Sequence, residues 1–416
     1  MAPTSDVSPH ARAAASLGER LAPLTQAAAL ARWQLATTGT AAARDTVVAT
    51  TAALEAAHAD PAVHETLDAL RNERTTDAAG ARAIDVLYLR GLPSRGHAET
   101  RAALRETDAE LRRIFTTHRG SVGGVPTSPE SLRETLRASH DARERRDAWL
   151  ATISVGEAAA PLVRQAVRLR NQIARQLGYR DHFALGLAMQ ELAEDRLVDT
   201  LARVERATHA PFVANKNLHD LDLARRFGVP AEALRPWHYS DPFFQRVALP
   251  VGQGAFAALR ADALVDIATR FFDGLGLDVR PVLAASDLWP REDKSPYAFC
   301  THIDRARDVR VLCSLSADEA SLSTLLHELG HAVYDRYIGA QPWALATAAH
   351  PLVTEAVAML MGRQTRERDF VAEFGDAPQP FGDGAPGELR RAAAFQMQVF
   401  ARWTNVVTGF ERALYA

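Results

Sequence analysis

Helical periodicity runs through nearly the whole chain and constrains the fold more than any other feature of the sequence. Apolar side chains recur every three or four residues in several long segments, among them residues 128–153, 160–179 and 191–221. At the start of the first segment, Ser128 can cap a helix, and Pro129 stands where its missing N–H does no harm. Gly178 is a suitable C-terminal stop for the second segment. The pattern therefore predicts an all-α protein.

One short segment, residues 308–316, breaks this pattern with the spacing of a β-strand. Its alternating residues are Val309, Val311, Cys313 and Leu315. Residues 297–303 can pair with this segment, so we expect a small β-hairpin beside the helix that follows. Cys300 and Cys313 could face each other across the hairpin, and we expect both to be buried and reduced.

The composition of the chain narrows its expected cellular location and the classes of partner that it can bind. The chain has 416 residues, 47% of them hydrophobic and 24% charged, which suits one large domain or two to three smaller ones. A net charge of −3 gives no basic field for nucleic acid or an anionic membrane. The two cysteines cannot build a disulfide framework, and the N-terminus lacks the pattern of a signal peptide. We therefore expect a cytoplasmic protein without nucleic-acid or membrane partners.

The segment "STLLHELGHAVYDRY" places two histidines four residues apart on a predicted helix. Residues at i and i+4 share one face, so His327 and His331 can present their imidazoles to one metal ion. Glu328 is rotated about 100° from His327, which suits a general base that takes a proton from water better than a third ligand. The spacing is that of the H-E-x-x-H motif, in which a glutamate general base accompanies two histidine ligands.

The residues around the motif favour a metal site over a patch of histidines on the protein surface. The helix is apolar nearly all round, through Leu325, Leu326, Leu329, Ala332 and Val333. A buried helix that carries these polar groups without an ion would lose several kcal/mol, about the cost of unpaired buried polar groups. Gly330 in the helix interior predicts close packing by another element. We therefore interpret the segment as a metal-binding helix.

A catalytic zinc site usually has three protein ligands, so a third one must come from elsewhere. Glu355 is the candidate that we favour, in a helix that begins at Pro351, and His350 is the alternative. Asp335 is either a carboxylate that supports a histidine ligand or a member of a surface ion pair.

These residues resemble the gluzincin peptidases of the peptidyl-dipeptidase A (angiotensin-converting-enzyme-like) family, with the thimet-oligopeptidase and oligoendopeptidase group next. The resemblance covers HELGH and the glutamate of "TEAVAMLMGR", and it extends to segments of short bacterial members. These segments include "ARWQLATTGT", "LRNQIARQLGYRDHFAL", "LRPWHYSDPFFQ", "THIDRARDVRVLCSLS" and "FARWTNVVTGFERALYA". It implies a single domain over residues 1–416, a helical ellipsoid with a deep central channel. The N-terminal half would cover about 1–235 and the zinc-bearing half about 236–416.

Carried over by residue, the resemblance implies one Zn²⁺ per chain, bound by His327, His331 and Glu355, with Glu328 as general base. It assigns His302 a contact with the substrate backbone, and an edge strand at that position can bind an extended peptide by adding it to the sheet. The transition-state tyrosine of the family has no counterpart after Glu355, so the chain resembles a C-terminally shortened member.

The expected function is hydrolysis of short peptides, with release of C-terminal dipeptides. The enzymatic alternatives are an oligoendopeptidase and a zinc carboxypeptidase that removes single residues. A catalytically impaired helical protein that only binds peptides is the alternative from another class. The substrate preference and the oligomeric state do not follow from the sequence.

Overall fold

A computed structural model describes residues 7–247, 256, 259–291, 294–295, 297–339, 341–375 and 385–416. The chain forms two compact units, each built from two stretches of sequence: Met1–Arg95 with Gly252–Asp383, and Gly96–Val251 with Gly384–Ala416. The expected halves, about 1–235 and 236–416, do not coincide with these units. The difference arises because the first helix packs against the hairpin near residue 300, and the last helix packs against a helix that begins at residue 194.

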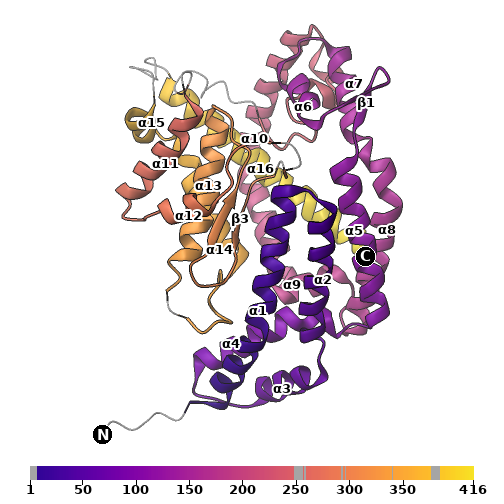
Figure 1. Ribbon diagram of the computed structural model, residues 1–416. Helices are drawn as coiled ribbons and strands as arrows, with labels where there is room; N and C mark the ends of the chain where they lie inside the picture. Colours follow the sequence, from indigo (N-terminus) through magenta and orange to yellow (C-terminus); the bar gives the residue numbers. More distant parts are fainter. Residues whose placement is uncertain are drawn as a thin grey trace. The chain divides into compact units, whose positions relative to one another are not determined.

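The first unit is helical apart from one hairpin (Figure 1). Its N-terminal elements are α1 (Pro9–Thr38), α2 (Ala41–His58), α3 (Pro61–Asn72), α4 (Ala78–Gly91) and η1 (Leu92–Arg95). Its later elements are α11 (Ala261–Gly274), α12 (Arg280–Ala285), β3 (Phe299–His302), β4 (Val309–Leu312), α13 (Glu319–Arg336), α14 (Pro351–Gly362), η4 (Arg363–Arg366) and α15 (Arg368–Phe374).

The second unit is also helical, with a short hairpin of its own. Its elements are α5 (Ala98–Thr117), β1 (Gly120–Val122), β2 (Val125–Thr127), α6 (Pro129–Ala138), α7 (Ala142–Ile153), α8 (Val155–Gln176), α9 (His182–Met189), α10 (Glu194–Phe227), η2 (Ala231–Ala233), η3 (Pro236–His238) and α16 (Ala385–Tyr415). The all-α prediction with a small hairpin next to the H-E-x-x-H helix is therefore confirmed.

Local signals in the sequence explain many of the helix ends. The Ser128 hydroxyl accepts a hydrogen bond from the N–H of Ser131 at 3.1 Å, so it caps α6 as predicted. Gly178, with a φ of 82°, follows the end of α8. The predicted helix over 128–153 is broken, however, because Ser139 takes an extended conformation and the Asp141 carboxylate caps a new helix, α7.

The β1–β2 hairpin was not predicted. Its strands pair antiparallel around Gly123 and Gly124, which have φ values of 59° and 83°. Glycine adopts this left-handed conformation without a steric cost, and Gly-Gly is a favoured two-residue connection in hairpins. The Gly-Gly pair is thus a local turn signal for this hairpin.

The β3–β4 hairpin lies between two helices of the first unit. Its register pairs Cys300 with Val311 and His302 with Val309. The face that carries the two valines packs into the same apolar cluster as α13. The other face, through Ile303, packs against Trp33 of α1. Because both faces are covered, the position of the hairpin against α13 is fixed by apolar contacts on each side.

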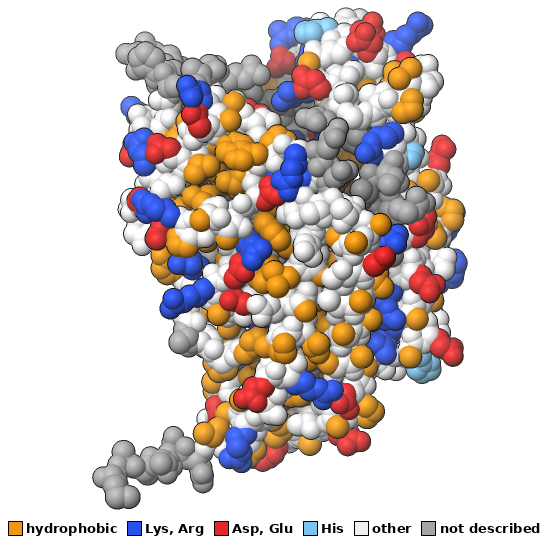
Figure 2. Space-filling view, viewed as in Figure 1, with side chains coloured by type: hydrophobic (Ala, Val, Ile, Leu, Met, Phe, Trp, Pro, Cys, Tyr) orange, Lys and Arg blue, Asp and Glu red, His pale blue; other side chains and the backbone are white. Residues whose placement is uncertain are grey.

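Positive and negative side chains are mixed on the visible surface (Figure 2), so no large electrostatic field of one sign arises there. On the face shown in Figure 2, Lys and Arg side chains alternate with Asp and Glu. This fits the small net charge of −3. Among the residues that the structure describes, no helix combines the length and the apolar character needed to cross a membrane.

Replacement of Leu325 by alanine tests the contact between α13 and the hairpin. The Leu325 side chain is fully buried in the cluster that contains Val309 and Val311. We expect the Leu325→Ala variant to lose about 2–5 kcal/mol of unfolding free energy, because the cavity cannot fully collapse. Urea unfolding measures the loss. Val48→Ala, at a largely exposed position of α2, should change stability by no more than about 0.5 kcal/mol. Equal effects of the two substitutions would contradict this packing.

Candidate metal centre

Helix α13 carries the H-E-x-x-H motif in an apolar setting. Asp318 caps the helix by accepting a hydrogen bond from the N–H of Ser321 at 2.7 Å. The leucines that surround the motif are fully buried: Leu322, Leu325, Leu326 and Leu329. The predicted burial of this helix is therefore confirmed.

Helices α13 and α14 cross at very short distance, and a glycine on each helix makes the approach possible. A Cβ atom on Gly330 would lie 2.8 Å from the Cα of Ala358. A Cβ on Gly362 would lie 3.0 Å from the carbonyl oxygen of Ser323. The Ser323 hydroxyl donates a hydrogen bond of 2.8 Å to the carbonyl of Gly362. The close packing that Gly330 predicted is thus present, and its partner is the helix that bears Glu355.

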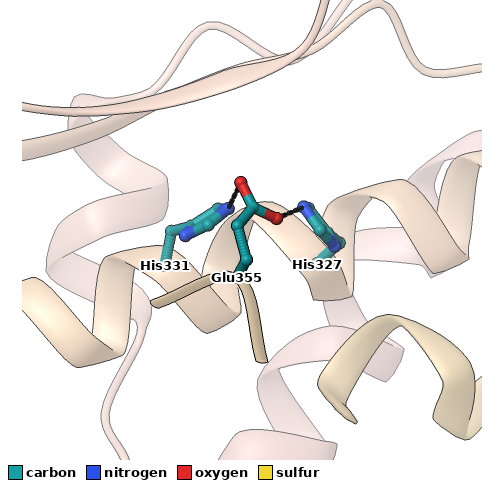
Figure 3. Close-up of side chains that lie close together, drawn as sticks. All are labelled: His327, His331 and Glu355. Carbon is teal, nitrogen blue, oxygen red and sulfur yellow. Dashed lines mark ion pairs between the residues drawn. The ribbon is translucent and has the colours of Figure 1, made fainter. Parts of the chain in front are cut away.

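Three side chains from these two helices converge. His327 and His331 point from α13 toward the carboxylate of Glu355, which extends from α14 between the two rings (Figure 3). The Glu355 oxygens lie 3.7 Å from Nε2 of His327 and 3.6 Å from Nε2 of His331. The two imidazole rings are nearly perpendicular, with centroids 4.9 Å apart. The three ligand atoms all lie within 4.8 Å of one another.

The donor set fits a metal ion such as zinc. Ligand atoms at about 2.0–2.1 Å from a tetrahedral ion stand about 3.3 Å from each other, slightly closer than the contacts to Glu355. Burial lowers the pKa of both histidines, although the charge of Glu355 opposes this, so the neutral form that can bind a metal is favoured. The Glu355 side chain is 54% exposed, so the set is open on the carboxylate side.

His331 has a second partner that the sequence analysis missed. Its Nδ1 is hydrogen-bonded to the hydroxyl of Thr354 at 2.7 Å. When Nδ1 carries the proton, the lone pair of Nε2 is free to bind a metal ion, and Nε2 is the atom that faces Glu355. Thr354 therefore orients the His331 ring so that Nε2 faces Glu355, and its hydroxyl can accept the Nδ1 proton of the tautomer that binds a cation through Nε2. Its position directly before Glu355 was visible in the sequence, but its contact with His331 was not.

Glu328 lies on a different side of α13 from the two histidines. It is buried, and burial together with the charge of Glu355 raises its pKa to about 7. A hydrogen bond from the backbone of Cys300 opposes this shift. Glu328 therefore lies between the ligand set and β3, where a carboxylate can exchange protons near neutral pH.

Among the described residues, no further strand pairs with β3 on the side opposite to β4. Val311, the partner of Cys300, has its N–H bonded to the Ser286 hydroxyl and its carbonyl bonded to the N–H of Asp287. Cys300 and Val311 are therefore a non-hydrogen-bonded pair of the β3–β4 ladder. Because such pairs alternate with hydrogen-bonded ones, the backbone N–H and carbonyl groups of Cys300 and His302 point away from β4. The N–H of Cys300 already donates to the Glu328 carboxylate, so the carbonyl of Cys300 and the backbone groups of His302 are the ones that can pair with another extended segment.

The structure does not bring His302 into the metal cluster. Both of its ring nitrogens are buried without a hydrogen-bond partner, and the nearest acidic oxygen, on Asp304, is 3.8 Å from Nε2. Burial lowers the pKa of His302, and the charges that act on it belong to the hairpin turn: Asp304, Arg305 and Asp308. In this conformation the backbone of His302, not its ring, is placed to meet a ligand.

The remaining candidates take other positions. The ring of His350 accepts a hydrogen bond from the N–H of Leu352 and caps α14, so it is not part of the ligand set. Asp335 forms no ion pair within the described chain. Burial raises its pKa to about 6, and its charge acts on Cys300. It therefore lies toward β3 and neither supports His331 nor joins a surface pair.

Cys300 and Cys313 are both free thiols on the face of the hairpin that packs against α13. Cys300 stands opposite Val311, so the two cysteines are offset along the hairpin and not directly paired. Burial raises the pKa of Cys313 to about 12 and that of Cys300 well above its usual range. Both cysteines are unbridged, as predicted, whereas the predicted burial is complete for Cys313 only, because Cys300 is partly buried.

Comparison with known proteins adds no identification: no protein-family model matches this chain, and no curated protein matches it. The inference of a function therefore depends on the residues of this site and their geometry.

Replacement of Gly330 by alanine tests the crossing of α13 and α14. Alanine normally stabilises a helix relative to glycine by about 0.5–1 kcal/mol, but here its methyl group would collide with the backbone of Ala358. We expect Gly330→Ala to lower the unfolding free energy by about 1–3 kcal/mol. Gly409→Ala in α16, where nothing lies within 4 Å of the added atom, should be neutral or stabilising. Urea unfolding of both variants checks the difference, and a stabilised Gly330→Ala protein would contradict the close approach.

Proposed function

We propose that the protein is a zinc-dependent metallopeptidase that hydrolyses short peptides. The observation that carries the proposal is the convergence of His327, His331 and Glu355, with Glu328 on the adjacent buried side of the same helix. Two neutral imidazoles and one carboxylate are the usual ligands of a catalytic zinc ion, which keeps one further position open.

Zinc, when bound, would acidify a water molecule and polarise the scissile carbonyl group. The protein residues have distinct tasks around it. His327, His331 and Glu355 would hold the ion, and Thr354 orients the ring of His331 so that Nε2 would face it. Glu328 takes the proton from the attacking water and returns it to the nitrogen of the leaving amine. Its burial beside the ligand set supports this role, because burial raises its pKa to about 7, where a carboxylate can both accept and return a proton near neutral pH.

The substrate would be a peptide in an extended conformation. The outer edge of β3 offers the carbonyl of Cys300 and the backbone groups of His302, while the N–H of Cys300 donates to Glu328. A peptide added to this edge would therefore pass next to the general base. Leu352, one turn before Glu355 in α14, is 64% exposed and could contact an apolar side chain of the peptide.

Release of C-terminal dipeptides is the mode of cleavage that we propose, in line with the resemblance of the motif region. Internal cleavage of oligopeptides remains the alternative. The deep channel and the cytoplasmic location stay predictions.

Zinc analysis combined with a Glu328→Gln substitution tests the function. We expect one zinc ion per chain in both proteins, and a loss of peptide hydrolysis of at least about 10²-fold in the variant, because glutamine cannot accept the proton. Glu373→Gln, at an exposed position of α15, is the matched control and should keep full activity. Mass spectrometry of the products separates dipeptide release from single-residue release and from internal cleavage.

The same experiment has two outcomes that would overturn the proposal. Absence of zinc at saturating concentration would remove the metal site. Stoichiometric zinc without any turnover of short peptides would favour a protein that binds peptides but does not cleave them.

A Thr354→Val substitution tests how His331 is positioned. Valine has nearly the same shape as threonine but lacks the hydroxyl that bonds to Nδ1. We expect zinc affinity to fall by about 10–100-fold, as for other losses of a group that orients a metal ligand. Thr354→Ser keeps the hydroxyl and should restore most of the affinity. Competition with a chromophoric chelator measures both variants, and equal affinities would show that the hydroxyl does not matter.

A further inference from the structure

Two arginines of the first unit meet at one turn of the chain, far from each other in sequence. Arg90 lies in the last turn of α4, and Arg305 lies in the connection between β3 and β4. Arg305 donates from Nη1 to the carbonyl of Trp343, and Arg90 donates from Nη1 to the carbonyl of Ala344, each at 3.4 Å. Because these carbonyls belong to consecutive residues, the two guanidinium groups are neighbours.

No carboxylate neutralises this pair in the described part of the chain. The acids closest in sequence are engaged elsewhere. The Asp304 side chain accepts from the N–H groups of three residues that follow it, and Asp308 forms a two-point ion pair with Arg310 at 2.7 Å. Neither Arg90 nor Arg305 forms an ion pair with a described acidic residue. Two partly buried cations therefore face each other with only neutral groups as partners.

The electrostatics of the cluster agree with this picture. Burial and the neighbouring Arg90 charge lower the pKa of Arg305 to about 9, and burial also lowers the pKa of Arg90. Burial and then the charges of both arginines lower the pKa of His58. A buried charge without a counter-charge is strongly unfavourable, so an anion at this position would stabilise the folded protein.

A fully buried arginine elsewhere in the chain shows how many backbone carbonyls can accept hydrogen bonds from one guanidinium group. Arg145, 1% exposed, uses four backbone carbonyls, at distances of 2.7–3.2 Å: those of Ser139, Trp237, His238 and Tyr239. Arg90 and Arg305 each have one carbonyl, and at a longer distance. Neither guanidinium has a nitrogen atom that is both fully shielded from solvent and without a hydrogen-bond partner.

The Arg305 side chain is held in place for such a ligand. Arg305 has a φ of 56°, an unusual value for a residue other than glycine, and such strain persists where the surrounding contacts enforce it. Its guanidinium carbon lies 4.1 Å from the centroid of the Trp343 ring. Stacking on an aromatic ring leaves the edge of the guanidinium free, and this edge is the part that binds carboxylates and phosphates through two parallel hydrogen bonds.

We propose that Arg90 and Arg305 form a binding site for an oxyanion, a carboxylate or phosphate group, at the turn of the β3–β4 hairpin. The oxyanion would be either a free ion or an acidic group carried by a bound peptide. The site does not include the residues of the metal centre, and it does not depend on zinc.

Phosphate titration of the metal-free protein tests the site. We expect inorganic phosphate to bind with one-to-one stoichiometry in calorimetry and to raise the pKa of His58, followed by NMR. Arg305→Gln and Arg90→Gln should each weaken binding by at least about tenfold, while Arg307→Gln, on the exposed side of the same turn, should not. Absence of binding to the wild type, or equal binding to the wild type and both glutamine variants, would overturn the proposal.

A second variant and a peptide competition complete the test. Arg305→Lys keeps the charge but cannot form two parallel hydrogen bonds, so it should fold like the wild type and bind phosphate more weakly. An acidic peptide that displaces phosphate, while its Asn/Gln counterpart does not, identifies the peptide carboxylate as the ligand. Phosphate that no peptide displaces identifies a free ion. Because these measurements need neither zinc nor turnover, they are independent of the peptidase assay.

Discussion

The close crossing of α13 and α14 is the contact on which the candidate site depends. Each helix contributes a glycine to the crossing, Gly330 and Gly362, and each packs its backbone against the other helix at these points. Since His327 and His331 stand on one helix and Glu355 on the other, the distance between the helices sets the distance between the ligand atoms. A side chain at either glycine would separate the helices by more than the tolerance of a metal site, in which ligand distances vary by about 0.2 Å.

The hairpin gives α13 a second fixed neighbour. Apolar contacts cover both of its faces, so β3 is held at a defined position relative to Glu328. The three parts of the proposed site are therefore positioned by different elements: the proposed ligands by the helix crossing, the proposed base by burial, and the strand edge by the hairpin. None of these parts lies on a loop, which suits a site that needs precise geometry.

The parts of the structure that could be predicted from sequence are those set by local signals. The helical fold follows from periodicity, the start of α6 from Ser128 and Pro129, and the burial of α13 from its leucines. The break between α6 and α7 was missed because the side chain of Asp141 competes with continuation of the helix, and periodicity does not reveal this competition. For the site, the i, i+4 spacing of His327 and His331 was sufficient, whereas Thr354 was missed because its contact depends on how two helices pack.

Two further features, the Arg90–Arg305 cluster and the unpaired ring of His302, result from tertiary packing and have no signal in the local sequence. Arg90 and Arg305 are separated by more than 200 residues and meet only because α4 and the hairpin turn share the segment around Trp343. The unpaired ring of His302 is likewise a consequence of the folded turn and not of its neighbours in sequence.

Both ring nitrogens of His331 face consecutive residues of α14: Nδ1 is hydrogen-bonded to Thr354, and Nε2 lies 3.6 Å from Glu355. Successive residues of a helix are separated by a rise of about 1.5 Å and a rotation of about 100°, so sliding or turning α14 would move both partners away together. The two contacts therefore cannot be lost one at a time by a rigid movement of the helix. The geometry of the proposed metal centre therefore depends on the register of one short helix.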